Sequence, residues 1–164
     1  MDNYIVINGK KAELTEEQLK QLGINVEKET PFTRNKPEGV YYFIATRGAV
    51  VEATDDNDLL DQGLYGSVNY FRDKNLAEQV ALHQLLYRKL LKYAYEHDAT
   101  DCDWNNFDKK KFYIVWQAKE NKWAVDGFFT LKGSNIYFSD DKVANDAIED
   151  VVKPFLKEYP EFVW

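Results

Sequence analysis

The sequence predicts an α+β fold with two layers, in which a mostly antiparallel sheet carries its helices on one face. Short runs rich in aromatic and β-branched residues recur in pairs around turn residues, which is typical of antiparallel strands. Two longer stretches have apolar residues at helical spacing, and each follows such a pair. The chain has 164 residues, of which 45% are hydrophobic and 30% charged, so it can form one globular domain with its own core.

The first 39 residues predict a small N-terminal unit that precedes the rest of the domain. Residues 4–14 have the pattern of two strands around an Asn-Gly turn, because both turn residues tolerate a left-handed backbone. Thr15 and Gln18 have the spacing of a helix capping box, and Gly23 is placed to end that short helix. Residues 25–38 contain two prolines and no helical period, which predicts an irregular linker.

Residues 40–98 and 99–164 predict two units with the same order of elements. In each, a pair of strands is followed by a polar segment, a short third strand and a helix. The expected strands are residues 40–44, 49–51, 68–71, 112–116, 123–129 and 135–138. The expected helices run from Asp73 to about His97, and from about Asp141 to Pro154, where the proline ends or kinks the helix.

The segment that leads into each helix indicates an internal repeat. Residues 66–77 match residues 133–144 at six of twelve positions. In each copy a Tyr-Phe pair comes from a strand, an Asp lies where a helix N-cap is expected, and an Ala allows close helix packing. Any strand that leads into a capped helix could converge on part of this pattern. The shared Gly-Ser pair, which a cap does not require, favours duplication of a β-β-β-α unit.

One face of the predicted sheet is a candidate surface for a protein partner. If both helices cover the same face, the other face exposes aromatic side chains. These are Tyr41, Phe43, Trp116 and Trp123. Contiguous apolar patches usually mark partner sites or dimer interfaces. We therefore expect an interaction with another protein or with a second copy of this chain.

Residues 54–66 form an acidic segment with four aspartates and no basic residue. Repulsion between like charges is expected to keep this segment solvated as a loop. The formal net charge of the chain is −7. Spaced carboxylates can imitate nucleic-acid phosphates in the basic groove of an enzyme. An acidic inhibitor of this kind is the alternative reading, and its candidate residues are Asp55, Asp56, Asp58 and Asp61.

No motif in the sequence predicts catalysis or a cofactor. Asp101, Asp103 and Asn105 have the spacing of the first ligands of a calcium loop, but the Gly and Glu that complete such a loop are missing. Cys102 lies between two carboxylates, which disfavour the thiolate that a nucleophile needs. We expect a protein that is not an enzyme and holds no metal or cofactor. A small enzyme without a recognisable motif remains the alternative.

Charge and hydropathy argue against nucleic-acid and membrane binding. Basic residues cluster only at 109–111 and along the long helix, and the acidic balance of the chain opposes a polyanion. No run has the length of a membrane span or the form of a signal peptide. We therefore expect a cytoplasmic protein.

Four aromatic segments carry a resemblance that covers most of the chain from about Pro31. They are TPFTR at 30–34, GVYYFI at 39–44, NYFRDK at 69–74 and DWN at 103–105. Together they resemble a family of small uncharacterised proteins encoded by bacteriophages and prophages of Gram-positive bacteria (Firmicutes). The resemblance implies a phage or prophage origin, and a phage-encoded protein would be expected in the host cytoplasm. We expect an accessory protein of this origin that acts through protein–protein interaction. The resemblance implies no activity, cofactor or site residue.

Overall fold

The structure, a computed structural model, describes residues 4–7, 9–23 and 28–163 and has an α+β fold with small antiparallel sheets. The strands are β1 (Tyr4–Ile7), β2 (Lys10–Glu13), β3 (Val40–Ile44), β4 (Val50–Thr54), β5 (Lys111–Gln117) and β6 (Lys122–Phe128). The helices are α1 (Glu16–Gln21), α2 (Leu59–Gly66), α3 (Lys74–Glu96), α4 (Asp141–Ala147), the π-helical turn η1 (Ile148–Val152) and α5 (Lys153–Glu158).

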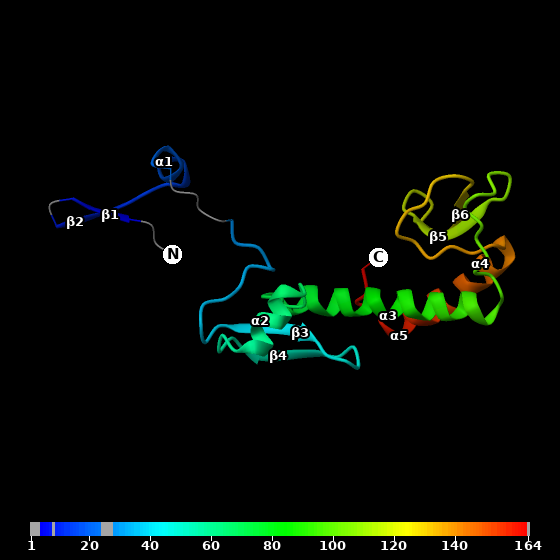
Figure 1. Ribbon diagram of the computed structural model, residues 1–164, viewed down its shortest axis with the longest axis horizontal. Coiled ribbons are helices and arrows are strands. Elements are labelled where there is room, and N and C mark those ends of the chain that lie inside the picture. The colour runs from blue at the N-terminus through cyan, green and yellow to red at the C-terminus, as the bar shows by residue number, and fades with distance from the viewer. Residues whose placement is uncertain (1–3, 8, 24–27, 164) are drawn as a thin grey trace.

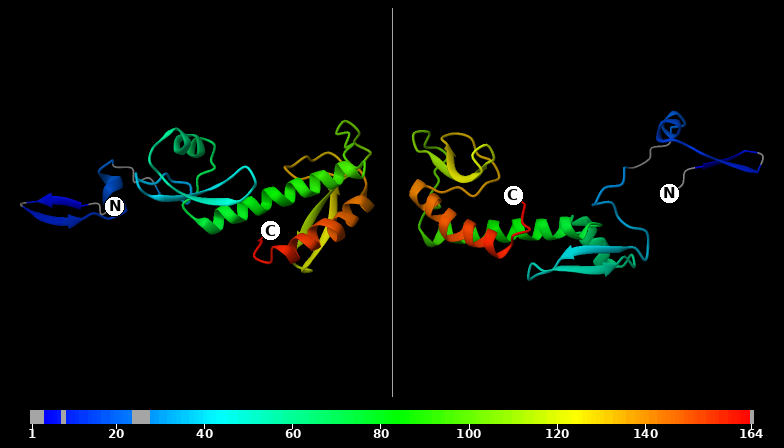
Figure 2. Two further views of the ribbon diagram at one scale, coloured as in Figure 1. Left: turned by 90° about the horizontal axis from the view of Figure 1, so that it is seen from below. Right: turned by 180° about the vertical axis from the view of Figure 1, so that it is seen from behind.

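The long helix α3 connects two lobes (Figure 1). The first lobe, at the N-terminal end of α3, contains the β3–β4 hairpin and α2. The second lobe, at the other end, contains the β5–β6 hairpin and α4, while α5 runs beside α3 (Figure 2). The elements β1, β2 and α1 lie apart from both lobes. The two lobes therefore share α3 as a common support.

The predicted helix starts are confirmed where a side chain caps the first turn. Asp73 Oδ1 accepts a hydrogen bond from Leu76 N at 3.1 Å, and α3 ends at the C-cap His97. Thr15 and Gln18 form the predicted capping box at the start of α1. The hairpin before α1 is present, with Gly9 at φ 76°, whereas Asn8 and residues 24–27 lie outside the described residues.

The expected single sheet is replaced by three separate two-stranded sheets. Each predicted third strand is reduced to one bridge, between Tyr42 and Phe71 in the first lobe and between Phe112 and Phe138 in the second. In the first lobe the cause is Val68, whose φ of 58° is incompatible with an extended strand. The prediction of one continuous sheet with a shared open face was therefore wrong.

The two lobes nevertheless use corresponding residues in the same way. Phe71 and Phe138 each exchange two backbone hydrogen bonds with the first strand of their lobe. Asp73 and Asp140 each cap the helix that follows, at 3.1 and 3.0 Å. Ala77 is completely buried on α3. Its counterpart on α4, Ala144, is buried to the same degree.

The main hydrophobic core lies in the second lobe. It is formed by α3, β5 and the helical segment from α4 to α5, with Phe138, Val152 and Phe155 among its most buried side chains. Pro154 neither ends this helical segment nor breaks it. The turn before it widens into η1, where Lys153 N bonds to Ile148 O. A wider turn gives the proline ring room that an α-helix lacks.

Candidate partner-binding site

The acidic segment contains a buried ion pair. Arg34 Nε and Nη2 each donate a hydrogen bond of 2.8 Å to the carboxylate of Asp55, which is 1% exposed. Tyr70 OH donates to Asp55 Oδ2 at 2.9 Å, and Asn57 N donates to Oδ1. The hydrogen bonds from Arg34, with those from Asn57 and Tyr70, lower the pKa of Asp55 to about 2, although burial opposes this shift. Asp55 therefore joins the segment before β3 to the end of β4.

A second buried carboxylate holds α2 in place. Tyr41 OH donates to Asp61 Oδ1 at 2.7 Å, and the backbone amides of Asp56 and Asp58 donate to Oδ2. Burial is the main cause that raises the pKa of Tyr41, and the hydrogen bond to Asp61 adds to it. The ring of Tyr41 stacks on Tyr70 with centroids 4.1 Å apart, which links the two carboxylates into one network.

This network corrects three of the predicted contact residues. Asp55, Asp61 and Tyr41 are buried, so none of them lies on a surface that a partner can touch. Asp56 and Asp58 remain exposed. The solvated loop expected at 54–66 contains α2 instead, because Arg34 neutralises Asp55 and because Asp58 and Asp61 form a capping box. That Asp-x-x-Asp spacing was the sequence signal for the helix.

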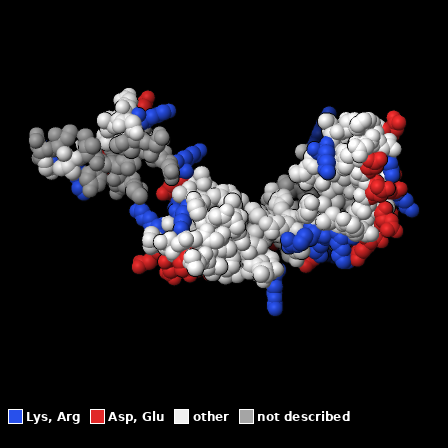
Figure 3. Space-filling view, in the orientation of Figure 1, with Lys and Arg blue, Asp and Glu red and all other residues white. Residues whose placement is uncertain are grey.

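Helix α2 reverses the usual pattern of burial. Of its eight residues only the aspartate, Asp61, is buried. Leu59 is 86% exposed and Leu60 is 60% exposed. At the other end of the helix, Tyr65 and Val68 are exposed as well. We call Leu59, Leu60, Tyr65 and Val68 the α2 surface. Figure 3 shows a largely uncharged surface over α2 and the neighbouring strands, with acidic residues at its edge.

The predicted aromatic residues do not form one face. Trp116 and Trp123 are cross-strand partners in the β5–β6 hairpin, with ring centroids 5.0 Å apart. Trp116 is partly exposed, and Trp123 packs against the core of the second lobe. Phe43 lies in the first lobe, half-buried and 6.1 Å from Tyr41. The pairs belong to separate sheets, so the structure does not bring them together.

The segment with calcium-like spacing forms a local turn. Asp103 Oδ1 accepts a hydrogen bond from Asn105 N at 2.9 Å, so this carboxylate caps its own backbone. Asp101 is exposed, and within the described chain no three His, Cys, Asp or Glu side chains are grouped as metal ligands. The neighbouring Cys102 is half-buried, and burial raises the pKa of its thiol.

The basic cluster at 109–111 is only partly at the surface. Lys111 is fully buried, and its Nζ donates to the carbonyl oxygens of Asn106 and Phe129. The same ammonium lies 5.4 Å from the ring centre of Trp104. Lys111 therefore ties the loop before β5 to the end of β6 and is not available to a phosphate backbone.

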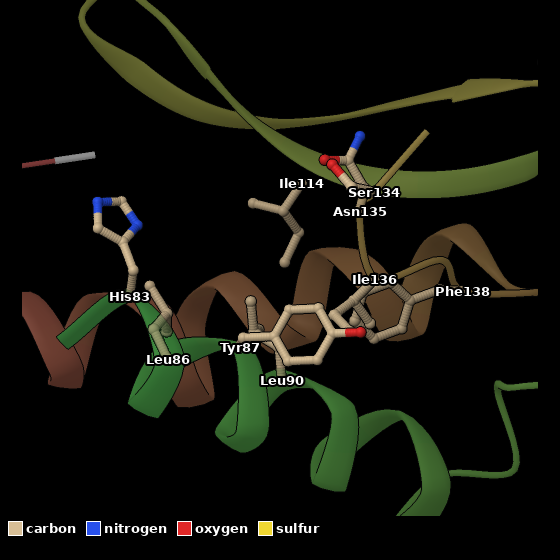
Figure 4. Close-up of a pocket in the computed structure, with 9 residues that line it drawn as sticks. All are labelled: His83, Leu86, Tyr87, Leu90, Ile114, Ser134, Asn135, Ile136 and Phe138. Carbon is tan, nitrogen blue, oxygen red and sulfur yellow. The ribbon is translucent and has the colours of Figure 1, made fainter. Parts of the chain in front are cut away.

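A pocket that the sequence did not indicate lies between α3 and the second lobe. Its volume is about 200 Å³, and it is formed by one side of α3, by β5 and by residues 134–138 (Figure 4). The segment that supplies its far wall belongs to the repeated Gly-Ser-x-x-Tyr-Phe pattern at 133–138. The lining residues are His83, Leu86, Tyr87, Leu90, Ile114, Ser134, Asn135, Ile136 and Phe138.

Comparisons with known proteins identified no relative of this chain. A scan of protein-family models and searches of curated proteins and of solved structures each found nothing that matches this chain. Among the helices that the structure describes, none combines the length and the apolar character that crossing a membrane requires.

Proposed function

We propose that this chain is a non-enzymatic protein-interaction module that binds its partner through the α2 surface. The observation that carries the proposal is the reversed burial of α2, whose one buried side chain is the carboxylate of Asp61 while Leu59 is 86% exposed. Burial of a leucine side chain stabilises a protein by about 1.5–3 kcal/mol. A partner that buries the two adjacent exposed leucines of α2 would therefore gain a large favourable free energy of binding.

The surroundings of α2 indicate the chemistry of the partner. Asp56 and Asp58 are exposed immediately before Leu59 and Leu60. An apolar contact next to exposed carboxylates favours a protein segment with apolar residues flanked by Lys or Arg. The hydrogen bonds of Asp61 fix α2 before the partner arrives, which reduces the entropy lost on binding.

The experiment is capture of partners from a nuclease-treated lysate of a Gram-positive host, with identification by mass spectrometry. The test variant is Leu59→Ser with Leu60→Ser, and the matched control is Tyr95→Ser, because Tyr95 is 66% exposed on α3. We expect a partner that wild type and control retain and the double variant loses. Equal capture by all three proteins, or no partner for the wild type, would contradict the proposal.

The acidic-inhibitor alternative makes a different prediction in the same assay. Binding through charge alone would be lost in Asp56→Asn with Asp58→Asn and in high salt, and would survive the leucine substitutions. The free carboxylates available for such mimicry are fewer than the sequence suggested, because Asp55 and Asp61 are engaged within the protein. This favours the apolar contact over mimicry.

We also propose that residues 40–98 and 99–164 are duplicated units of a phage-encoded accessory protein of the host cytoplasm. The duplication is supported by the matched bridges of Phe71 and Phe138 and by the matched caps of Asp73 and Asp140. If the partner of α2 is a second copy of the chain, light scattering will give the mass of a dimer, and the double leucine variant will give that of a monomer.

A further inference from the structure

The pocket between α3 and the second lobe has an apolar floor and a polar mouth. Leu86, Leu90 and Phe138 form the floor and belong to the buried core, so the base of the pocket is closed. Ser134 and Asn135 lie on the opposite wall, and Figure 4 shows them across the cavity from α3. A ligand with an apolar body and a polar end matches this arrangement.

The far wall of the pocket is held in position by hydrogen bonds. Gly133 N donates to Tyr137 OH at 2.7 Å, and the ring of Tyr137 meets Trp104 edge-on at 4.8 Å. At the other end of the wall, Phe138 exchanges two backbone hydrogen bonds with Phe112. The wall is thus anchored on both sides of Ser134 and Asn135. The pocket is built before any ligand binds, as in most small-molecule sites.

The absence of acidic and basic side chains from the described lining is the feature that most restricts the ligand. In this chain 30% of the residues are charged, yet the nine described residues that line the pocket include no Asp, Glu, Lys or Arg. The larger groove beside Trp116, of about 420 Å³, contrasts with it because four charged side chains line that groove. Transfer of an ion into an uncharged apolar pocket is strongly unfavourable. The pocket therefore favours an uncharged ligand over a charged one.

The size of the pocket limits that ligand to about one ring system. An apolar cavity of about 150 Å³ lined by Leu, Ile and Phe is enough to bind benzene. The pocket here is about 200 Å³ and open at its mouth, which leaves room for a substituent. Tyr87 supplies an exposed aromatic face, while Ser134 and Asn135 supply hydrogen-bonding groups.

We propose that this pocket binds an uncharged aromatic ring that carries a hydrogen-bonding substituent, as in a phenol or an indole. Such a ring has two sources: a free small molecule, or a Tyr or Trp side chain of a peptide. The proposal does not depend on the function of the α2 surface, which lies in the first lobe.

The test is a titration followed by the amide signals of the protein in ¹H–¹⁵N NMR spectra. The probes for a free ligand are p-cresol and indole, and the probes for a peptide side chain are N-acetyl-tyrosinamide and N-acetyl-tryptophanamide. We expect saturable shifts of the amides of residues 83–90 and 134–138. 4-Hydroxybenzoate, which adds a carboxylate to the same ring, should bind at least about tenfold more weakly. Binding by either pair of probes supports the proposal and identifies the source of the ring.

The matched variants are Ser134→Trp, which fills the mouth of the pocket, and Ser67→Trp at the corresponding position of the first lobe. Both serines are exposed. Loss of binding in Ser134→Trp with retention in Ser67→Trp is expected, and Asn135→Trp replaces the first variant if its spectrum is not that of a folded protein. The proposal is overturned if no probe shifts these amides, if 4-hydroxybenzoate binds as well as p-cresol, or if binding survives when the mouth is filled.

Discussion

Arg34 and Asp55 form a two-pronged ion pair in which both hydrogen bonds measure 2.8 Å. The pair closes the first lobe, because it ties the linker that precedes β3 to the residue that follows β4. Asp55 is almost completely buried, whereas Arg34 keeps a quarter of its side chain in water. A buried carboxylate depends on its partner, so the loss of one member should cost more than the loss of a surface pair.

The ion pair predicts a specific loss of stability in acid. The pKa of Asp55 is lowered in the folded protein from an ordinary 3.8 to about 2, so folding favours the ionised form. This contribution is present above about pH 4 and is lost as the pH falls from about 4 to about 2. Urea unfolding between pH 2 and pH 6 measures it. Asp55→Asn should lower the free energy of unfolding at pH 7 by about 3 kcal/mol and flatten the acid dependence. The exposed Asp56→Asn should change neither, and an equally steep acid dependence in Asp55→Asn would contradict the assignment.

Tyr41 is predicted to control the attachment of α2. The change Tyr41→Phe removes the hydroxyl that donates to the buried carboxylate of Asp61. We expect a loss of about 1–3 kcal/mol of unfolding free energy, because a buried acceptor loses one of its donors. In the Tyr41→Phe variant the α2 amides should exchange hydrogen faster than in the wild type, and the amides of α4 serve as the internal reference. Tyr95→Phe, at an exposed position of α3, is the control. Unchanged exchange in α2 would show that Asp61 does not hold the helix.

The two aspartate caps should contribute similar and independent amounts. Asp73→Ala removes the cap of α3, and Asp140→Ala removes the cap of α4. Each is expected to lower the free energy of unfolding by about 1 kcal/mol. The caps belong to different helices, so the double variant should lose the sum of the two. Chemical denaturation of the three variants, with the exposed Asp101→Ala as control, gives these values. A loss well above the sum would show that the lobes depend on each other.

Two glycines give opposite predictions for the same substitution. A Cβ added to Gly127 would lie 2.5 Å from the carbonyl oxygen of Lys111, so Gly127→Ala forces the β5–β6 hairpin apart. We expect destabilisation by about 1–3 kcal/mol. Nothing lies within 4 Å of a Cβ at Gly63 in α2, where alanine also favours the helix. Gly63→Ala should therefore raise the melting temperature while Gly127→Ala lowers it. Shifts of the same sign would contradict the packing described for these positions.

Much of the local structure could be predicted because its determinants are close in the sequence. The caps at Thr15 and Asp73 involve donors and acceptors three residues apart. The spacing of apolar residues along α3 shows directly which face of this helix packs against the rest of the protein. Elements of this kind need no knowledge of distant residues.

The candidate site could be predicted only in part, since its burial depends on residues far apart in the chain. Asp55 is buried because Arg34, 21 residues earlier, reaches it. Asp61 is buried because Tyr41, 20 residues earlier, donates to it. The pattern of charges at 54–66 suggested a solvated loop, since it contained no nearby cation. Likewise, nothing local shows that residues 134–138 come to lie across a pocket from His83.

The sequence by itself determined the class of the fold, the order of its main elements and the positions of several helix ends, because these follow from side chains within about one helical turn. Only the tertiary structure decided which carboxylates are buried, that the strands form three small sheets, and that Leu59 and Leu60 remain in water. The physical reason is that burial of an ionised or apolar side chain depends on what the rest of the chain brings to it. In this protein the decisive partners, Arg34 and Tyr41, lie outside the segment whose exposure they determine.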